Sequence, residues 1–594
     1  MPSQAGCDPP RLVVGGSPAE RIQNLLTLLY GEVAGRAVGD RLIRLLERYR
    51  PRVPAPRTVD LSARDAVLIT YADQVREPGT PPLRTLTDFA GQHLAGLIST
   101  IHLLPFYPYS SDDGFAVIDY RAVHPAFGDW NDVARLGRHF RLMLDLVLNH
   151  VSAQHQWFQG FLRDDPRYRD FFIVVPAGVD LSLVVRPRTQ PLLTRFVTRR
   201  GEQAVWTTFG PDQIDLNYGQ PDVLLEMIDV LLFYVTHGAE FIRLDAIAYL
   251  WKEPGTTCLH RPQTHQVIQL LRAVLDAVAP HVRLITETNV PHVENLSYFG
   301  DGRNEAQLVY NFALPPLVLH AFQTGSAMTL ARWAAGLSLP SAQVTFLNFL
   351  ASHDGIGLNP ARGILTEAEI DALVECALAH GGRVSYKDNL DGTRSPYELN
   401  INYFDALSDP GADEPLDRQV DRFMAAQAIM LALVGVPGIY VHSLFGSRGW
   451  PEGVQLTGHQ RAINREKWDR ATLEHELNDP LSRRCRVFRR YRRLLCARAA
   501  QPAFHPHGEQ RVLNASPAVL ALLRRGPAGA GPVLCLHNVT ARPQVAGVDL
   551  VTAFGASPGR LTDLLTGRTV DARRALRLGP YQVRWLTVPP NKSP

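Results

Sequence analysis

Three carboxylates and one arginine stand in or at the end of apolar runs of this sequence. Arg243 and Asp245 lie one residue apart in "EFIRLDAI", Glu287 falls in "VRLITET", and Asp354 ends "VTFLNFLASHD". Burying an ionised carboxylate is costly unless the group is paired or used in chemistry. Carboxylates that converge raise the pKa of at least one member, which then suits general acid catalysis. The pattern predicts an acid/base site built from several strand ends.

Alternation within "EFIRLDAI" indicates how this run is placed. In a strand, Phe241, Arg243 and Asp245 share one face, and Ile242 and Leu244 share the other. The apolar face suits packing against helices. The charged face must therefore look into a polar interior.

Eight β-rich runs alternate with helical or looped segments, a pattern typical of parallel strands joined by crossovers. We predict an α/β fold, a closed (β/α)₈ TIM barrel, whose active site lies where the carboxyl ends of the strands meet. The runs are residues 66–71, 96–105, 140–150, 240–247, 282–288, 305–312, 344–354 and 435–442.

The spacing of these runs predicts the domain organisation. Helical periodicity before the barrel indicates an N-terminal helical extension in residues 1–60, followed by a catalytic barrel in residues 61–504. Two stretches are too long for simple crossovers, so we expect inserted subdomains after strand 3 (151–239) and after strand 7 (355–434). Short strands with Gly and Pro turns predict a C-terminal all-β, sandwich-like domain in residues 505–594.

Composition excludes several classes of protein. Of 594 residues, 45% are hydrophobic and 20% charged, which is ordinary for a globular protein. A net charge of +3 with dispersed arginines gives no reason to expect a nucleic-acid partner. No apolar run is long enough to predict a membrane span, and no secretory signal is evident. Six widely spaced cysteines favour a reducing cytoplasm over a disulfide framework or a zinc site.

Several motifs together resemble one known superfamily. "DLVLNHVS", "RLDAIAYLWKE", "ITETNVPH" and "ASHDGIGL" are similar, in order, to motif regions of the α-amylase superfamily (glycoside hydrolase family thirteen). "LITYADQ", "KEPGTTC", "YNFALPPLVLHA" and "RAINR" resemble its sucrose-phosphorylase-like subgroup. The resemblance covers roughly residues 65–470 and implies a retaining glycosyltransferase that acts on α-glucosides.

The resemblance implies a role for each matched residue. Asp245 would be the nucleophile that forms a β-glucosyl ester, Glu287 the acid/base, and Asp354 the stabiliser of the transition state, with Arg243 orienting the nucleophile. Two carboxyl groups about 5 to 5.5 Å apart suit such a two-step, retaining displacement. Matched positions that would hold the glucosyl hydroxyls are Asp112, His150, His353 and Arg465.

Simpler interpretations stand beside these roles. His150 could be a core histidine bonded to a backbone carbonyl rather than a substrate ligand. Asn149 ends a motif that supplies a calcium ligand in many amylases, but no acidic cluster accompanies it, so we predict no metal. Tyr109 and Phe115 could stack on a sugar or could be core aromatics.

A phosphorylase needs cations near its acceptor, because the attacking phosphate is an anion beside carboxylates. "VVRPR" supplies Arg186 and Arg188 in the first insertion, and the subgroup carries a similar arginine motif. These residues could instead belong to a solvated loop. We expect inorganic phosphate as co-substrate and no other cofactor.

Three features resemble the phosphorylases of this subgroup that act on glucosylglycerate. They are the helical extension, "ETNVPHVENLSYFG" and "YKDNLDGTRSPYELN", whose Lys387 and Arg394 could meet a glycerate carboxylate. Sucrose, sucrose 6′-phosphate and glucosylglycerol stay open as substrates. A hydrolase or transglucosidase, or a non-catalytic binding protein, is the alternative class. The expected partners are small molecules only, with the enzyme a monomer or homodimer.

Overall fold

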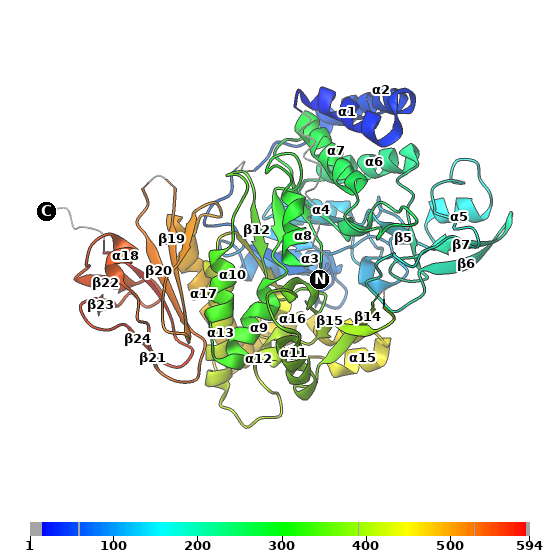
Figure 1. Cartoon of the computed structure of the whole chain (residues 1–594). Helices are drawn as coiled ribbons and strands as arrows, with labels where there is room; N and C mark the ends of the chain where they lie inside the picture. Colours follow the sequence, from blue (N-terminus) through cyan, green and yellow to red (C-terminus); the bar gives the residue numbers. More distant parts are fainter. Residues whose placement is uncertain (1–14, 58–59, 390, 528, 590–594) are drawn as a thin grey trace.

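The computed structural model describes residues 15–57, 60–389, 391–527 and 529–589. Within these residues, eight parallel strands close into a barrel in the order β1-β3-β4-β9-β10-β11-β12-β16 (Figure 1). Each strand overlaps one of the eight predicted runs, so the predicted (β/α)₈ barrel is confirmed. The strands are β1 (Val67–Thr70), β3 (Thr100–Leu103), β4 (Arg141–Leu146), β9 (Ala239–Leu244), β10 (Arg283–Thr286), β11 (Leu308–Tyr310), β12 (Thr345–Asn348) and β16 (Val436–Tyr440).

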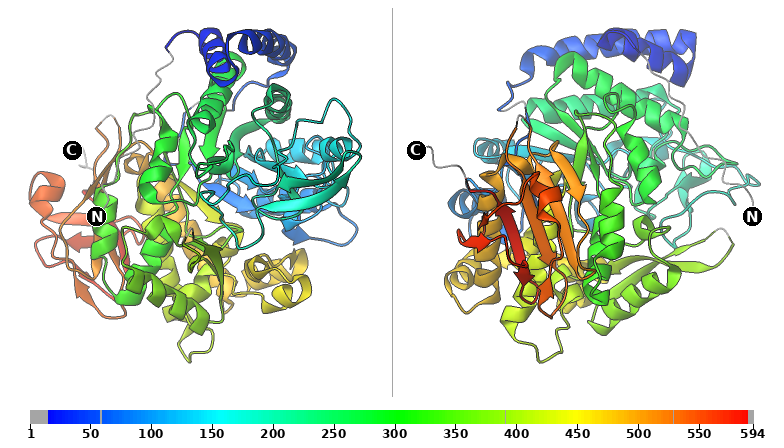
Figure 2. Two further views of the ribbon diagram at one scale, coloured as in Figure 1. Left: turned by 45° about the vertical axis from the view of Figure 1, so that its right-hand side comes forward. Right: turned by 60° about the vertical axis from the view of Figure 1, so that its left-hand side comes forward.

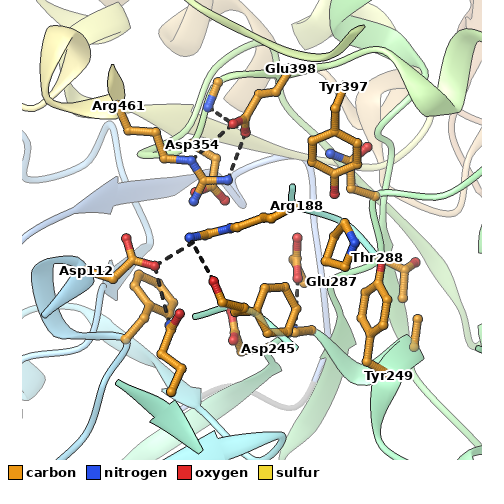
Figure 3. Close-up of a pocket in the computed structure, with 18 of the residues that line it drawn as sticks. Asp112, Arg188, Asp245, Tyr249, Glu287, Thr288, Asp354, Tyr397, Glu398 and Arg461 are labelled. Atoms are coloured by element: carbon orange, nitrogen blue, oxygen red, sulfur yellow. Dashed lines mark hydrogen bonds and ion pairs between the residues drawn. The ribbon is translucent and has the colours of Figure 1, made fainter. Parts of the chain in front are cut away.

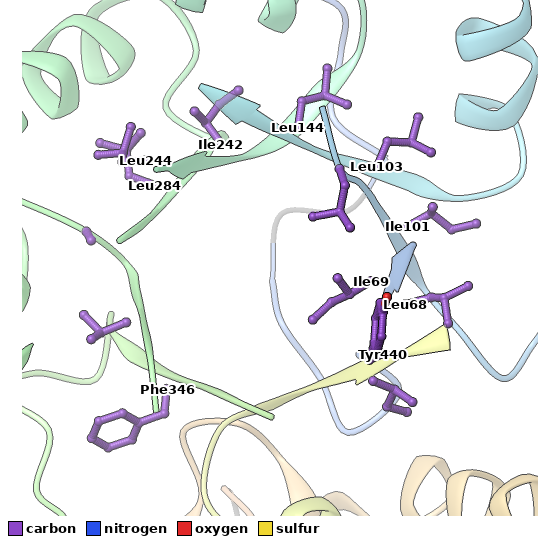
Figure 4. Close-up of a cluster of buried hydrophobic side chains, with 14 of the residues drawn as sticks. Leu68, Ile69, Ile101, Leu103, Leu144, Ile242, Leu244, Leu284, Phe346 and Tyr440 are labelled. Atoms are coloured by element: carbon purple, nitrogen blue, oxygen red, sulfur yellow. The ribbon is translucent and has the colours of Figure 1, made fainter. Parts of the chain in front are cut away.

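The two faces of the barrel strands carry different side chains. Leu144 and Ile242 pair in register on β4 and β9, and both belong to the large core beneath the surrounding helices (Figure 4). Met143 and Phe241 lie in a second cluster inside the barrel. Burying one such side chain contributes about 1.5–3 kcal/mol. The alternation predicted for β9 therefore fixes which face turns inward, and it turns Arg243 inward as well.

Helices surround the barrel (Figure 1). Those of the outer layer are α3 (Pro82–His93), α4 (Trp130–Gly137), α6 (Pro221–Thr236), α7 (Pro262–Val278), α8 (His292–Leu296), α9 (Leu314–Thr324), α10 (Met328–Ala335), α13 (Leu416–Ala432), α14 (Val441–Leu444), α15 (Pro451–Thr457), α16 (Arg470–Asn478) and α17 (Arg483–Ala499). Several begin with proline in the first turn, where the missing N–H costs nothing. In α7, buried Val267, Leu270, Leu271 and Val274 recur at three- and four-residue spacing, which presents one apolar face to the strands.

Two insertions rise at the carboxyl ends of the barrel strands, as the fold prediction stated. The first follows β4 and holds two antiparallel pairs and a helix: β5 (His150–Ser152) with β8 (Gln213–Asp215), β6 (Leu193–Thr198) with β7 (Gly201–Trp206), and α5 (Gln156–Leu162). The second follows β12 and holds a small sheet, β13 (Ile356–Gly357), β15 (Arg394–Asn400) and β14 (Arg383–Asp388), with helices α11 (Glu367–Ala379) and α12 (Tyr403–Leu407). Both insertions contribute to the site described below.

The N-terminal extension is a helical hairpin of α1 (Pro18–Tyr30) and α2 (Glu32–Tyr49), which packs on α7 and α6 (Figure 2). Arg41 lies 2.5 Å from Asp222 on α6. The Tyr30 hydroxyl donates to the Tyr218 carbonyl oxygen at 2.9 Å, and the Tyr218 hydroxyl donates to the Leu148 carbonyl oxygen at 2.7 Å. The hairpin is therefore linked through Tyr218 to the backbone at Leu148, two residues before His150.

The C-terminal part is a β domain beside the barrel (Figure 2). Its larger sheet has the order β18-β19-β20-β25-β22-β23, and β21 pairs with β24. Buried Arg524 joins this sheet to the barrel by donating to the carbonyl oxygens of Ala432 and His505, each at 2.8 Å. The elements are β18 (Glu509–Val512), β19 (Val519–Arg525), β20 (Val533–Asn538), β21 (Gln544–Val545), α18 (Leu550–Phe554), β22 (Arg560–Asp563), β23 (Thr569–Asp571), β24 (Arg577–Leu578) and β25 (Val583–Thr587).

In the described part of the chain, no helix combines the length and the apolar character that crossing a membrane would require.

Candidate active site

A cavity opens where the carboxyl ends of the barrel strands meet the two insertions (Figure 3). Seven of the predicted site residues line it: Asp112, His150, Arg188, Asp245, Glu287, His353 and Asp354. Residues that the sequence did not single out also line it: Phe209, Gln213, Ala246, Tyr249, Asn289, Phe312, Tyr397, Glu398 and Arg461. The fold therefore gathers the three predicted catalytic carboxylates around one space.

Arg243 is the hub beneath these carboxylates. Its Nη1 lies 2.8 Å from Asp245 Oδ1 and also contacts Asp145, and its Nη2 lies 3.9 Å from Glu287 Oε2. The Arg243 side chain is only 3% exposed. A buried charge is tolerated when opposite charges and hydrogen bonds surround it. Arg243 and Asp245 at the end of β9 thus belong to a buried network of charges that also includes Asp145 and Glu287.

Asp245 and Glu287 have perturbed acidities. Burial raises the pKa of both groups, the carboxylates of Glu287, Asp145 and Asp354 add to the rise at Asp245, and Arg243 opposes it at both sites. Two close carboxylates of this kind share one proton near neutral pH. Because Arg243 lies nearer to Asp245 than to Glu287, the geometry favours the charge on Asp245 and the proton on Glu287. This division suits a nucleophile and a general acid.

Asp354 is held in its ionised form. Burial alone would raise its pKa, but the guanidinium groups of Arg461, Arg465 and Arg243 outweigh burial and lower it. Arg461 Nη1 lies 2.5 Å from Asp354 Oδ1, and the same guanidinium donates to both oxygens of Glu398 at 3.0 and 3.1 Å. Arg461 therefore ties Asp354 to the second insertion. Arg461 was not among the predicted site residues, although it begins the "RAINR" motif that ends in Arg465.

Arg465 does not line the cavity. It is 4% exposed, its Nη1 lies 2.6 Å from Asp113 and 3.8 Å from Asp112, and its Nη2 lies 3.7 Å from Asp354. Arg465 Nε also donates to the His353 carbonyl oxygen at 2.8 Å. This arginine supports the cavity wall from behind, while its predicted contact with the glucosyl unit stays a prediction.

His150 and His353 lie in the cavity wall as neutral imidazoles, because burial lowers the pKa of His150 to about 4 and that of His353 to about 3. His150 Nε2 lies 3.0 Å from the Phe115 carbonyl oxygen, so this histidine both bonds to the backbone and faces the cavity. His353 stacks on the Phe115 ring with centroids 4.8 Å apart. Phe115 lines the cavity, whereas Tyr109 is not among the residues that do.

Asn149 bonds to an ammonium group rather than standing alone. Lys252 Nζ lies 2.6 Å from Asn149 Oδ1 and 2.7 Å from Asp215 Oδ2, with the Lys252 side chain 2% exposed. Among the residues that the structure describes, no cluster of three or more His, Cys, Asp or Glu side chains could hold a metal ion. The lysine connects the end of β4 to β8 of the first insertion.

The predicted acceptor cations have different positions. Arg188 lines the cavity, with its Nη2 3.4 Å from Asp112 and its guanidinium 5.7 Å from the Phe209 ring centre. Arg186 lies 3.5 Å from Asp388 on β14, so it links the two insertions. Lys387 and Arg394 do not line the cavity.

The fold of the second insertion determines the positions of Lys387 and Arg394. Arg394 is 66% exposed and pairs with Asp388 at 3.0 Å. Burial lowers the pKa of Lys387, whose charged neighbours are Arg362, Glu294 and Glu367. In the hairpin of β14 and β15, it is Tyr397 and Glu398, close to the β13 end of the sheet, that reach the cavity. The sequence could not reveal which part of this hairpin approaches the barrel.

Comparisons with known proteins agree with this architecture. The sequence profile described as "Alpha amylase, catalytic domain" matches residues 93–354. A glucosylglycerate phosphorylase of Allomeiothermus silvanus is 52% identical over 94% of this chain and 97% of that protein, and one of Spirochaeta thermophila is 50% identical over 96% and 99%. The crystal structure of sucrose 6F-phosphate phosphorylase from Thermoanaerobacter thermosaccharolyticum matches with a TM-score of 0.69 and 26% identity, covering 80% of this chain and 94% of that one.

A parallel eight-stranded barrel with acidic strand ends, two insertions and a C-terminal β domain defines an enzyme of the α-amylase class. The chain belongs to the α-amylase superfamily, and within it to the family of glycoside phosphorylases that these relatives represent. It is accordingly a glycosyltransferase, as the motif resemblance implied.

Proposed function

We propose that this enzyme reversibly phosphorolyses 2-O-α-D-glucosylglycerate to α-D-glucose 1-phosphate and D-glycerate. The observation that carries the proposal is the extent of the similarity to relatives bearing this activity in their names. Residues 1–60 make up about a tenth of the 594-residue chain, yet the Spirochaeta relative covers 96% of it, so the similarity reaches into the N-terminal extension. The sucrose 6F-phosphate phosphorylase covers only 80% at half the identity.

The cavity supplies the groups for a double displacement. Asp245 attacks the anomeric carbon while Glu287 protonates the departing glycerate oxygen, which gives a β-glucosyl ester. Phosphate then attacks the ester from the face that glycerate has left, with Glu287 as base, so the α configuration is retained through two inversions. Asp354, kept ionised by Arg461, would stabilise positive charge developing on the sugar ring.

Arg188 is the cation best placed for the acceptor. It lines the cavity and is one-third exposed, and among the described residues its ion pair with Asp112 and its hydrogen bond to the Phe209 carbonyl oxygen are long, at 3.4 and 3.5 Å. A guanidinium that is weakly engaged can turn to an incoming anion at small cost, and its planar fork suits both carboxylate and phosphate. Glycerate and phosphate occupy the cavity in turn, so one arginine can serve both.

We further propose that the enzyme uses phosphate as its co-substrate without a metal, acts in the cytoplasm, and works as a monomer or homodimer. The ammonium of Lys252 between Asn149 and Asp215 supports the first point, since it supplies a positive charge among oxygen ligands. The described cysteines carry free thiols, which is compatible with a reducing compartment.

The reverse reaction tests the substrate. The enzyme is supplied with α-D-glucose 1-phosphate and, in parallel, D-glycerate, glycerol, fructose or fructose 6-phosphate, and phosphate release is measured. Fastest release with D-glycerate is expected. Preference for a fructose or for glycerol would move the assignment to sucrose, sucrose 6′-phosphate or glucosylglycerol. Glucose release from glucosylglycerate without phosphate would instead indicate a hydrolase.

A further inference from the structure

One buried histidine inside the barrel has no part in the scheme above. His102 lies on β3, fully buried, with its Nε2 2.6 Å from Asp145 Oδ2. Its other ring nitrogen, Nδ1, has no hydrogen-bond partner in the described structure. Leaving a buried polar atom without a partner costs free energy, and an apolar side chain would avoid that cost. A histidine at this position therefore calls for a reason beyond packing.

The contact of His102 leads directly to the reacting groups. Asp145 uses Oδ2 for His102 and Oδ1 for Arg243, so each carboxylate oxygen has its own partner. The same Arg243 nitrogen that binds Asp145 donates to Asp245 Oδ1 at 2.8 Å. Register also places Asp145 opposite Arg243 on neighbouring strands. Three strands, β3, β4 and β9, thus form one chain of hydrogen bonds that ends at the proposed nucleophile.

We propose that His102 is a positioning residue: it keeps Asp145 ionised and turned toward Arg243, and through Arg243 it holds Asp245 in place for attack. The proposal rests on Asp245 being the nucleophile of the proposed function, but it does not depend on which acceptor is used. His102 itself touches neither sugar nor phosphate.

Loss of His102 would change how the site responds to acid. Asp145 Oδ2 would become a buried carboxylate oxygen without a donor, which raises the pKa of that group. Once Asp145 takes a proton, Arg243 loses its negatively charged partner on β4. Arg243 then no longer holds Asp245 in a fixed position. The charged and titratable groups that face this network from the surrounding elements are Tyr107, Arg243, Tyr310, His353, Glu287 and Asp354. All of them stay in place when His102 alone is replaced.

α-D-Glucosyl fluoride with phosphate isolates this effect. Fluoride leaves without protonation, so the fall of kcat/KM at high pH that Glu287 causes is removed. Only the fall of kcat/KM at low pH, the acidic limb of the pH profile, remains. We expect His102→Leu to move that limb toward higher pH by on the order of one unit. His102→Gln, whose amide N–H can donate to the same oxygen, should restore a nearly native profile. His537→Leu is the matched control, because His537 is fully buried on β20, far along the chain from the site, and should leave the limb unmoved.

A double-mutant cycle with Asp145→Asn separates positioning from packing. In the Asp145→Asn background no carboxylate is left to protonate, so adding His102→Leu should shift the limb no further. A native acidic limb in His102→Leu, even with a lowered Tm, would overturn the proposal, as would an equal shift in both backgrounds. If His102→Leu fails to fold, His102→Met, which also lacks an N–H for Asp145 Oδ2, takes its place, and a native acidic limb in that variant would overturn the proposal. No fluoride release by the wild-type enzyme would count against the retaining mechanism instead.

Discussion

The proposed glucosyl side and the proposed acceptor side of the site hold their cations differently. On the glucosyl side, Arg243 and Asp245 are 3% and 9% exposed and lie 2.8 Å apart. On the proposed acceptor side, Arg188 in the cavity wall and Arg186 beyond it are 33% and 34% exposed, and their ion pairs measure 3.4 and 3.5 Å. The first pair stands at the end of one strand of a closed barrel, whereas the second stands on an insertion loop.

This difference matches what each side has to do. In the proposed scheme the glucosyl unit stays in one place through both half-reactions, so a rigid, preorganised site lowers the barrier at each step. The acceptor side must release glycerate and admit phosphate, so its cation has to exchange partners. Rigid barrel ends suit the first task and loops suit the second.

The largest effect is expected on the buried side, at the nucleophile. Asp245→Asn removes the oxygen that forms the glucosyl ester and should lower kcat by roughly 10⁴-fold or more. Phosphate release from α-D-glucose 1-phosphate and glycerate measures it, with the Tm as control for folding. Near-native turnover by this variant would refute the assignment of the nucleophile.

Glu287→Gln should produce the next largest loss, and a selective one. Loss of a positioned acid costs roughly 10² to 10⁴-fold with glucosylglycerate, but far less with α-D-glucosyl fluoride. Because burial raises the pKa of Glu287, wild-type kcat/KM should fall as pH rises through that raised value and the acid loses its proton. Glutamine cannot lose a proton there, so this alkaline limb should vanish. Equal losses on both substrates would contradict the acid role.

Arg461→Met tests the cation that joins the two sides. It leaves Asp354 and Glu398 without their shared partner, and it removes the strongest of the charges that lower the pKa of Asp354. We expect kcat/KM to fall by on the order of 10²-fold, with the acidic limb of the pH profile moving to higher pH. Both donors, glucosylglycerate and α-D-glucosyl fluoride, should suffer. A loss confined to the phosphate-dependent step would move Arg461 to the acceptor side.

The smallest effects are expected on the acceptor loops, where a matched pair of variants is available. Arg188→Ala should raise the KM for phosphate and for glycerate by roughly 10- to 100-fold, the value of one charge-assisted hydrogen bond. Formation of the glucosyl ester from α-D-glucosyl fluoride should hardly change. Arg394→Ala, which removes an exposed cation paired with Asp388, should leave both KM values within about twofold. Similar increases in KM for the two variants would contradict the proposal that Arg188, and not Arg394, binds the acceptor.

The buried side could be predicted from sequence because its residues lie in or shortly after short barrel strands. Alternation placed Arg243 and Asp245 on one face, and a barrel brings all strand ends to one rim, so Glu287 and Asp354 followed. Arg461 was missed because it lies in a short 3₁₀ segment, where no periodicity indicates direction. Lys387 and Arg394 were expected at the acceptor side because their charges suited it, but which end of the hairpin reaches the cavity depends on long-range packing.

The sequence by itself determined the barrel, its eight strands, both insertions, and the family to which the enzyme belongs. These follow from local periodicity and from motifs confined to a few consecutive residues. Only the tertiary structure decided that Arg188 faces the cavity and Arg394 faces solvent, that Arg461 bridges Asp354 and Glu398, and that His102 supports Asp145. The physical reason is that the contacts of Arg188, Arg461 and His102 join segments 40 or more residues apart. Their side chains meet only when the whole barrel closes.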